Sequence, residues 1–127
     1  MTKIVYNACS GGFSLSEVAM RRYAEIKGEP IYVGKYDSSY NIYWRVPLEE
    51  RPGWGIVPPE SFTWSDRDFD RTDPVLVQVV EELGDLANGR YANLKIRELL
   101  PGTRYRIDEY DGYESVITQD EYKWSVA

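Results

Sequence analysis

The sequence contains no histidine and only one cysteine, Cys9. Without histidine, neither a Ser-His-Asp triad nor a Cys-His pair can form, and the common zinc sites need more cysteine or histidine ligands than this chain has. Catalysis by carboxylates alone stays open, although the composition favours an enzyme less than a binding protein. A single cysteine cannot form an internal disulfide, which fits a reducing compartment. We therefore expect a protein without a metal ion or a cofactor.

Long hydrophobic runs are also missing. The longest apolar stretches are only a few residues long, which excludes a membrane-spanning helix. The N-terminus leads directly into a strand-like segment and has no signal-peptide core, so we expect a soluble protein of the cytoplasm. The formal net charge is −6. This charge argues against a DNA or RNA polymer as partner, because non-specific binding to nucleic acid depends on neutralising phosphates.

The residues that are present indicate one folded domain. Hydrophobic residues make up 43% of the 127 residues and aromatic residues 14%, which argues against disorder. The length suits a single core, and no linker composition divides the chain, so we predict one domain over residues 1–127. The acidic charge is unevenly spread. Residues 1–27 carry four basic and two acidic side chains and are the one locally basic part.

Two segments have the periodicity and the end signals of helices. The first is predicted from about Leu15 to Lys27, started by a capping box of Ser14 and Glu17 and stopped by Gly28. The second is predicted over residues 74–88. Asp73 is a favourable N-cap residue for it, and Pro74 is favourable in its first turn. Gly84 falls inside this second prediction, where a glycine destabilises a helix by roughly 1 kcal/mol relative to alanine.

Six segments have the character of strands. They are "KIVYNA", "IYVGKY", "YNIYWRV", "ANLKIREL", "TRYRIDEY" and "YESVIT". Residues 37–39, Pro101-Gly102 and Asp111-Gly112 are predicted to turn the chain between neighbouring strands. The predicted order is β-α-(β-β)-loop-α-β-β-β. We therefore expect an α+β fold, with two helices packed on one face of a mostly antiparallel sheet.

The junction between the first strand and the first helix is a candidate ligand site. Asn7 ends the strand, and Gly11, Gly12, Phe13 and Ser14 lead into the helix. Free N–H groups at a helix N-terminus attract anions, and glycines allow a ligand to approach the backbone. The plainer interpretation is a tight turn with positive φ. The pattern is neither a P-loop nor a dinucleotide-binding fingerprint, so both interpretations stay open.

Two further groups of residues could bind phosphate. Asn88, Arg90 and Tyr91 follow the second helix and offer a guanidinium for phosphate and a ring for a base. The alternative is an ordinary helix end with a favourable arginine. Arg104 and Arg106 share one face of a predicted strand and form a candidate second site. The alternative for this pair is a solvated face balanced by nearby acids.

Three segments of the chain, in this order, resemble a family of short phage proteins, the first type of Thoeris anti-defence protein. They are "KIVYNACSGGFSLSEVAMRRYAE", "DPVLVQVVEELGDLANGRYANLKI" and the ending "IDEYDGYESV". The resemblance covers about half of the chain, over residues 3–27, 71–98 and 107–127. The family's tail often has a His-Arg pair before a tryptophan, where this chain has Lys123 and Trp124 in the run "EYKW".

The resemblance implies a sponge, which is a protein that sequesters a signal without degrading it. Proteins of this family bind cyclic ADP-ribose-type signals made by a bacterial TIR-domain enzyme, so that the downstream effector stays off. They are homo-oligomers that hold the ligand between subunits, and some also bind cyclic oligonucleotides at a separate site. On this basis we add Lys123 and Trp124 to the expected ligand-binding residues.

Two other functions stay open from the sequence. An acidic phage protein can also inhibit a host enzyme by direct contact, and the net charge and the segment "WSDRDFD" favour this interpretation. A small carboxylate-based glycohydrolase or transferase acting on a nucleotide is the third possibility. It would need a buried carboxylate with a raised pKa beside the glycine junction. Glu17 is the nearest candidate in the sequence, although the capping box already explains it.

Overall fold

The structure is a computed structural model that describes residues 1–35, 41–51, 63–65 and 69–119. The predicted α+β class and the predicted order of elements are both confirmed. The elements are β1 (Thr2–Asn7), α1 (Glu17–Lys27), β2 (Tyr32–Lys35), β3 (Asn41–Trp44), the short 3-10 helix η1 (Leu48–Glu50), α2 (Pro74–Leu83), a second 3-10 helix η4 (Gly84–Ala87), β4 (Leu94–Leu99), β5 (Tyr105–Tyr110) and β6 (Tyr113–Thr118).

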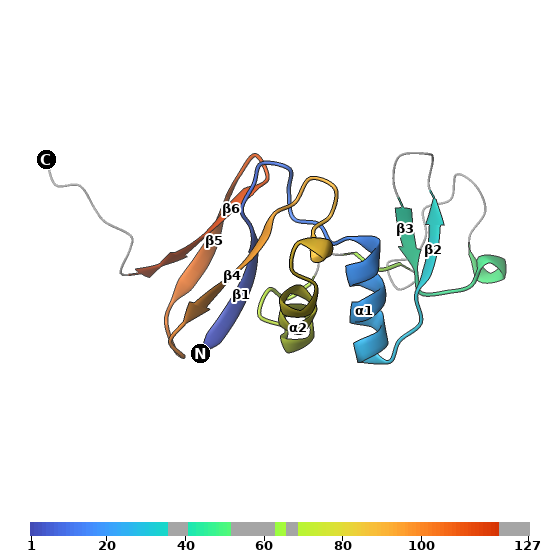
Figure 1. Cartoon of the computed structure of the whole chain (residues 1–127), viewed down its shortest axis with the longest axis horizontal. Helices are drawn as coiled ribbons and strands as arrows, with labels where there is room; N and C mark the ends of the chain where they lie inside the picture. Colours follow the sequence, from blue (N-terminus) through green and yellow to red (C-terminus); the bar gives the residue numbers. More distant parts are fainter. Residues whose placement is uncertain (36–40, 52–62, 66–68, 120–127) are drawn as a thin grey trace, which may run out of the picture.

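The described strands form three antiparallel ladders of two strands each. β1 pairs with β4, β2 with β3, and β5 with β6. Figure 1 shows the order of the layers: the β5–β6 hairpin lies against the β1–β4 ladder, α2 and α1 follow, and the β2–β3 hairpin lies beyond α1. The two helices therefore lie between the paired strands of the two chain ends and the hairpin of the middle segment.

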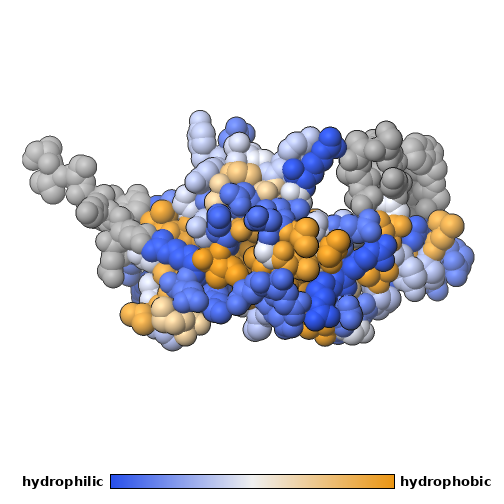
Figure 2. Space-filling model, in the orientation of Figure 1, coloured by the Kyte–Doolittle hydropathy of each residue, from blue (hydrophilic) through white to orange (hydrophobic). Residues whose placement is uncertain are grey.

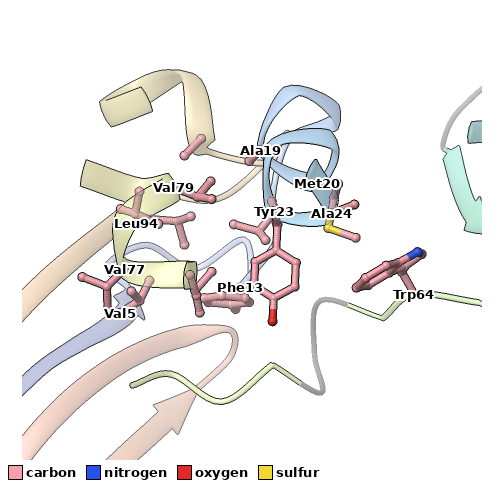
Figure 3. Packing of buried hydrophobic residues seen from close by; sticks show 14 residues of the cluster. Val5, Phe13, Ala19, Met20, Tyr23, Ala24, Trp64, Val77, Val79 and Leu94 are labelled. Atoms are coloured by element: carbon pink, nitrogen blue, oxygen red, sulfur yellow. The ribbon is translucent and has the colours of Figure 1, made fainter. Parts of the chain in front are cut away.

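The β1 strand is buried on both of its faces. Ile4 and Val5 point to opposite sides of the strand, and each has 0% of its surface exposed. Val5 joins the main core between the ladder and the helices, whereas Ile4 packs with Leu99 and Val116 between the two left-hand ladders of Figure 1. Figure 3 shows the main core, in which the side chain of Tyr23 from α1 stands between those of Phe13 and Trp64 in this view. This double burial places β1 between the β5–β6 hairpin and the helices.

The first helix begins two residues later than predicted. Its N-cap residue is Ser16, whose Oγ accepts a hydrogen bond from the N–H of Ala19 at 3.2 Å. The same hydroxyl donates to the carbonyl of Leu86 at 2.6 Å, so contact with η4 selects Ser16 over Ser14. The predicted capping box of Ser14 is therefore wrong. The predicted stop at Gly28 is confirmed, with a φ of 70° at that residue.

The second helix begins as predicted and ends earlier. Asp73 is the N-cap, and its side chain accepts a hydrogen bond from the N–H of Val75 at 2.9 Å. Gly84 does not lie inside the helix. It ends α2 with φ 56° and ψ −127°, a conformation that glycine adopts readily, and η4 then redirects the chain toward β4. The prediction of one helix over residues 74–88 is corrected accordingly.

Side chains join the two helices at both ends of their contact. Arg22 of α1 pairs with Glu82 of α2 at 2.9 Å. Tyr23 donates a hydrogen bond to Asp73 at 2.6 Å, and Lys27 pairs with the same carboxylate at 3.3 Å. Burial opposes ionisation of Asp73, but the hydrogen bonds from Tyr23, from a backbone N–H and from Lys27 outweigh it and lower its pKa.

No helix within the described ranges has the length and apolar character needed to cross a membrane.

Two of the three predicted turns lie in the described residues, and both are confirmed. Asp111 and Gly112 have φ values of 50° and 86°, as a two-residue type I′ hairpin requires. Gly102 has a φ of 84°, and the N–H of Thr103 donates to the carbonyl of Leu100 across Pro101-Gly102. The predicted turn at residues 37–39 lies outside the described residues.

Candidate functional site

A pocket of about 770 Å³ lies where three loops meet at one end of β1. Its wall includes the glycine loop, which we define as Gly11 to Ser14, together with Arg90 and Tyr91 from the segment after η4. Arg71 and the turn end of the β5–β6 hairpin complete it. The volume lies within the range of about 300–1,000 Å³ that is typical of small-molecule sites. The structure thus brings together two groups of residues that the sequence analysis proposed separately.

Three glycines allow the loops around this pocket to approach closely. A Cβ atom on Gly11 would overlap the backbone carbonyl of Tyr91, and one on Gly89 would overlap the side chain of Ser14. A Cβ on Gly112 would lie 2.6 Å from the backbone nitrogen of Gly12, which is too close for real atoms. The glycines are therefore needed for loop packing, beyond any freedom that they give a turn.

Asn7 holds the three loops in place. It is fully buried, and its Nδ2 donates to the carbonyls of Cys9 at 2.7 Å and Gly112 at 2.9 Å. Its Oδ1 accepts from the N–H of Asn93 at 2.8 Å. One side chain thus connects Cys9, which precedes the glycine loop, with the segment before β4 and with the hairpin turn. Because these bonds occupy both ends of the amide, the structure gives Asn7 a positioning role behind the pocket instead of a place in its wall.

Arg71 and Glu114 form an ion pair in the pocket wall. The guanidinium binds both carboxylate oxygens, with Nη1–Oε1 at 2.5 Å and Nη2–Oε2 at 2.9 Å. Both side chains are largely buried, and Oε1 also accepts from the N–H of Asn7 at 2.9 Å. The Arg71 guanidinium lies 3.6 Å from the centre of the Phe13 ring, a cation–π contact that anchors the glycine loop.

Arg90 and Tyr91 form the exposed side of the pocket. Within the described residues, the Arg90 guanidinium makes no ion pair. It lies 5.2 Å from the centre of the Tyr91 ring, and Tyr91 is 63% exposed. A free guanidinium beside an accessible ring can bind a phosphate and stack a base. These side chains are the part of the pocket wall best placed to meet a ligand from solvent.

The glycine loop offers backbone donors to the same pocket. Within the described part of the chain, the N–H groups of Gly11, Phe13 and Ser14 form no hydrogen bond. The N-terminus of α1 is a different case, because Ser16 already caps it and it does not line the pocket. The predicted anion site therefore stays a prediction for the glycine loop, and the first turn of the helix is not part of the pocket. Any contribution from backbone donors comes from the loop before the helix.

The structure brings together most of the predicted ligand residues. Those that line the pocket are Gly11, Gly12, Phe13, Ser14, Arg90 and Tyr91. Asn88 does not line it, and its Oδ1 instead accepts from the N–H of Leu94 at 2.8 Å. Lys123 and Trp124 lie outside the described residues. Four further residues of the pocket wall were not predicted: Arg71, Glu109, Gly112 and Glu114. The predicted Asp111-Gly112 turn brings Glu109 and Glu114 opposite each other, but no signal in the sequence places Arg71 beside them.

The predicted second site lies elsewhere. Arg104 is exposed beyond the start of β5, and Arg106 points away from the pocket side of the hairpin and pairs with Asp108 at 2.8 Å. Neither arginine lines the pocket. The second site stays a prediction, and the geometry of Arg106 agrees with the alternative of a solvated face balanced by an acid.

A second hollow lies on another part of the described surface. This hollow of about 750 Å³ beside Lys3 is shallow, and the ion pair between Lys3 and Glu81 lies along it at 2.9 Å. On the face shown in Figure 2, hydrophobic residues form several patches that hydrophilic residues separate. Within the described ranges, no group of acidic and cysteine side chains is arranged to hold a metal ion.

Comparisons of the chain with models of protein families, with curated proteins and with solved structures found no match.

Proposed function

We propose that this chain is a sponge that binds a cyclic ADP-ribose-type signal in the cytoplasm of a phage-infected cell and sequesters it without degrading it. The observation that carries the proposal is the meeting of the glycine loop with Arg90 and Tyr91 around one pocket. These residues come from two of the three segments that resemble the first type of Thoeris anti-defence protein. The resemblance supplies the ligand class, and the volume of about 770 Å³ supports the pocket as the place for a small molecule.

The chemistry of the pocket suits a nucleotide with two phosphates. Arg90 can bind a phosphate with two N–H groups, and the free N–H groups of the glycine loop can bind further phosphate oxygens. The exposed ring of Tyr91 offers a surface on which adenine can stack. The bound ligand would therefore be held by reversible polar and stacking contacts, as sequestration requires.

The buried acidic residue of the pocket, Glu114, is held in a way that does not suit catalysis. Glu114 is the buried carboxylate that an enzyme on this site would use, but Arg71 binds both of its oxygens and Asn7 donates to one of them. A general acid or base must exchange a proton with the substrate, and it needs a free oxygen within hydrogen-bond reach. Glu114 instead holds the pocket wall together.

A second copy of the chain would complete the site. Two arginines and two glutamates line the pocket, so its own side chains supply no net positive charge for a dianionic ligand. The Arg90 and Tyr91 side also faces solvent. We therefore include a homo-oligomer in the proposal, as the resemblance implies, with ligand held where two copies meet. Sedimentation with and without ligand measures the assembly.

One experiment separates the candidate functions. Purified protein is mixed with cyclic ADP-ribose isomers in a calorimeter, and the bound fraction is recovered by heat denaturation and identified by mass spectrometry. A sponge binds and releases the isomer unchanged, whereas an enzyme returns a product. If no isomer gives heat or a shift in melting temperature, the sponge is wrong and a protein-binding inhibitor becomes the leading interpretation.

A further inference from the structure

Two carboxylates face each other across the β5–β6 hairpin beside the pocket. The antiparallel register places Glu109 directly opposite Glu114, and both residues line the cavity. Like charges directly opposite on one face of a ladder destabilise the pairing. Asp111 and Gly112 set the type I′ geometry of the turn, and only one oxygen of Glu109 is used there, as the acceptor for the N–H of Gly112. Local conflicts of this kind are typical of functional sites.

The two carboxylates have different surroundings. Glu114 is buried and its charge is balanced by the guanidinium of Arg71. Glu109 is exposed, and within the described residues its one hydrogen bond is the 2.6 Å bond that Oε1 accepts from the N–H of Gly112. No cationic side chain of the described residues pairs with Glu109. Its second oxygen is therefore able to accept a hydrogen bond from a molecule in the pocket.

We propose that Glu109 is a specificity-determining residue that accepts a hydrogen bond from a free hydroxyl of the ligand's ribose, while Arg90 binds the ligand's phosphate. This inference rests on the proposed function and names the feature of the nucleotide that the pocket selects. A carboxylate repels a phosphate and attracts a hydroxyl donor, so the pair of Glu109 and Arg90 orients a molecule that carries both groups. The same pair discriminates against an anion that has no hydroxyl.

The test is a double comparison of ligand and protein. The ligands are cyclic ADP-ribose and its analogue that lacks the 2′ and 3′ hydroxyls of the adenosine ribose. The proteins are the wild type, Glu109→Gln and the control Glu98→Gln. Glu98 is an exposed residue of β4 outside the pocket, so its substitution removes the same charge without touching the site. Affinities are measured by calorimetry in buffer with EDTA, which removes divalent cations.

The wild type and Glu98→Gln should bind the hydroxylated ligand at least fivefold more tightly than the analogue, because a hydrogen bond to a charged group is stronger than one to a neutral group. Glu109→Gln should lose most of this preference, and it should bind the analogue at least as tightly as the wild type does. The glutamine can still accept the bond from Gly112, so the turn is preserved. Melting curves check the fold, and Glu109→Asp, which keeps the charge and shortens its reach, replaces the glutamine variant if that variant is unstable.

Two results would overturn the inference while leaving the sponge in place. One is full preference for the hydroxylated ligand in Glu109→Gln, which would assign the discrimination to another residue. The other is binding that needs Mg²⁺, which would make the carboxylates cation ligands. A wild type that binds neither ligand would overturn the inference together with the proposed function.

Discussion

Arg71 and Glu114 join the helix layer to the outer hairpin through an ion pair with two contacts, Nη1–Oε1 at 2.5 Å and Nη2–Oε2 at 2.9 Å. Arg71 lies three residues before the start of α2, and Glu114 belongs to β6. The pair lies beside one end of β1, where Asn7 donates its N–H to the same carboxylate. Because the pair is buried, it is a structural element of the pocket wall, and removing it should lower the free energy of unfolding.

Removing one partner of this pair should destabilise the protein strongly. We expect Arg71→Met to lower the free energy of unfolding by about 3 kcal/mol, because Glu114 would be left as a buried charge without a partner. The double variant Arg71→Met/Glu114→Gln should recover part of the loss, since glutamine carries no charge and can still accept from Asn7. Urea denaturation measures both. A double variant less stable than the single one would contradict this account.

The two glycines of the glycine loop should respond differently to alanine. Gly11→Ala should lower stability by about 2 to 3 kcal/mol, because the new methyl group overlaps the backbone of Tyr91. At Gly12 a Cβ meets nothing within 4 Å, so alanine should lower stability only through the strain of the φ of 90°, by about 1 to 2 kcal/mol. That methyl group would extend into the pocket, so Gly12→Ala should mainly weaken ligand binding. Thermal melts with and without cyclic ADP-ribose distinguish the two effects.

Arg90 should contribute to binding and not to folding. We expect Arg90→Ala to weaken binding of cyclic ADP-ribose at least tenfold, because one hydrogen bond to a charged group is worth about 1.5 to 3 kcal/mol. The exposed guanidinium makes no ion pair within the described residues, so stability should change by less than about 0.5 kcal/mol. Arg21→Ala, which removes an exposed arginine of α1 that pairs with Glu17 at 3.1 Å, is the control. Wild-type affinity in Arg90→Ala would remove Arg90 from the site.

The ion pair between the helices should be visible in an acid titration. Hydrogen bonds from Arg22 and Gln78 lower the pKa of Glu82 from its ordinary 4.5 to about 2. The folded-state pKa lies below the unfolded one, so the stabilisation is present above about pH 4.5 and is lost as the pH falls toward 2. In an NMR titration of the side-chain carbons, Arg22→Gln should move the Glu82 midpoint back toward 4.5. Arg21→Gln should leave it near 2, and an equal shift in both variants would show that the contact with Arg22 is not the cause.

The order of elements could be predicted because the local signals were strong. Asp73 and Pro74 mark the start of α2, Gly28 marks the end of α1, and Asp111-Gly112 marks the hairpin. The start of α1 was misplaced because Ser14 and Ser16 are both suitable caps. The contact of Ser16 with Leu86, a residue far away in the sequence, decides between them. The division of the strands into three ladders likewise depends on pairing between distant segments.

The candidate site could be predicted only in part, for a related reason. The glycine loop and Arg90-Tyr91 carry chemistry that is visible in their own residues, and the structure brings them to one pocket. Asn7 looked like a ligand residue because it ends a strand beside the glycines, but its burial and its bonds to three segments emerge only on folding. Arg71 and Glu114 carry no signal as separate residues, because each acquires its role from the other.

The burial of β1 on both faces also determines when the complete fold can form. Residues near the beginning of the chain pair with β4, from Thr2 opposite Leu99 to Asn7 opposite Leu94, and almost the whole chain must be synthesised before this ladder and its outer cover exist. Contacts between such distant segments form slowly, since the entropy of a long loop is lost before the contacts are gained. Glu109, Gly112 and Glu114 of the β5–β6 hairpin line the pocket, so we expect a shortened chain without this hairpin to lack the pocket.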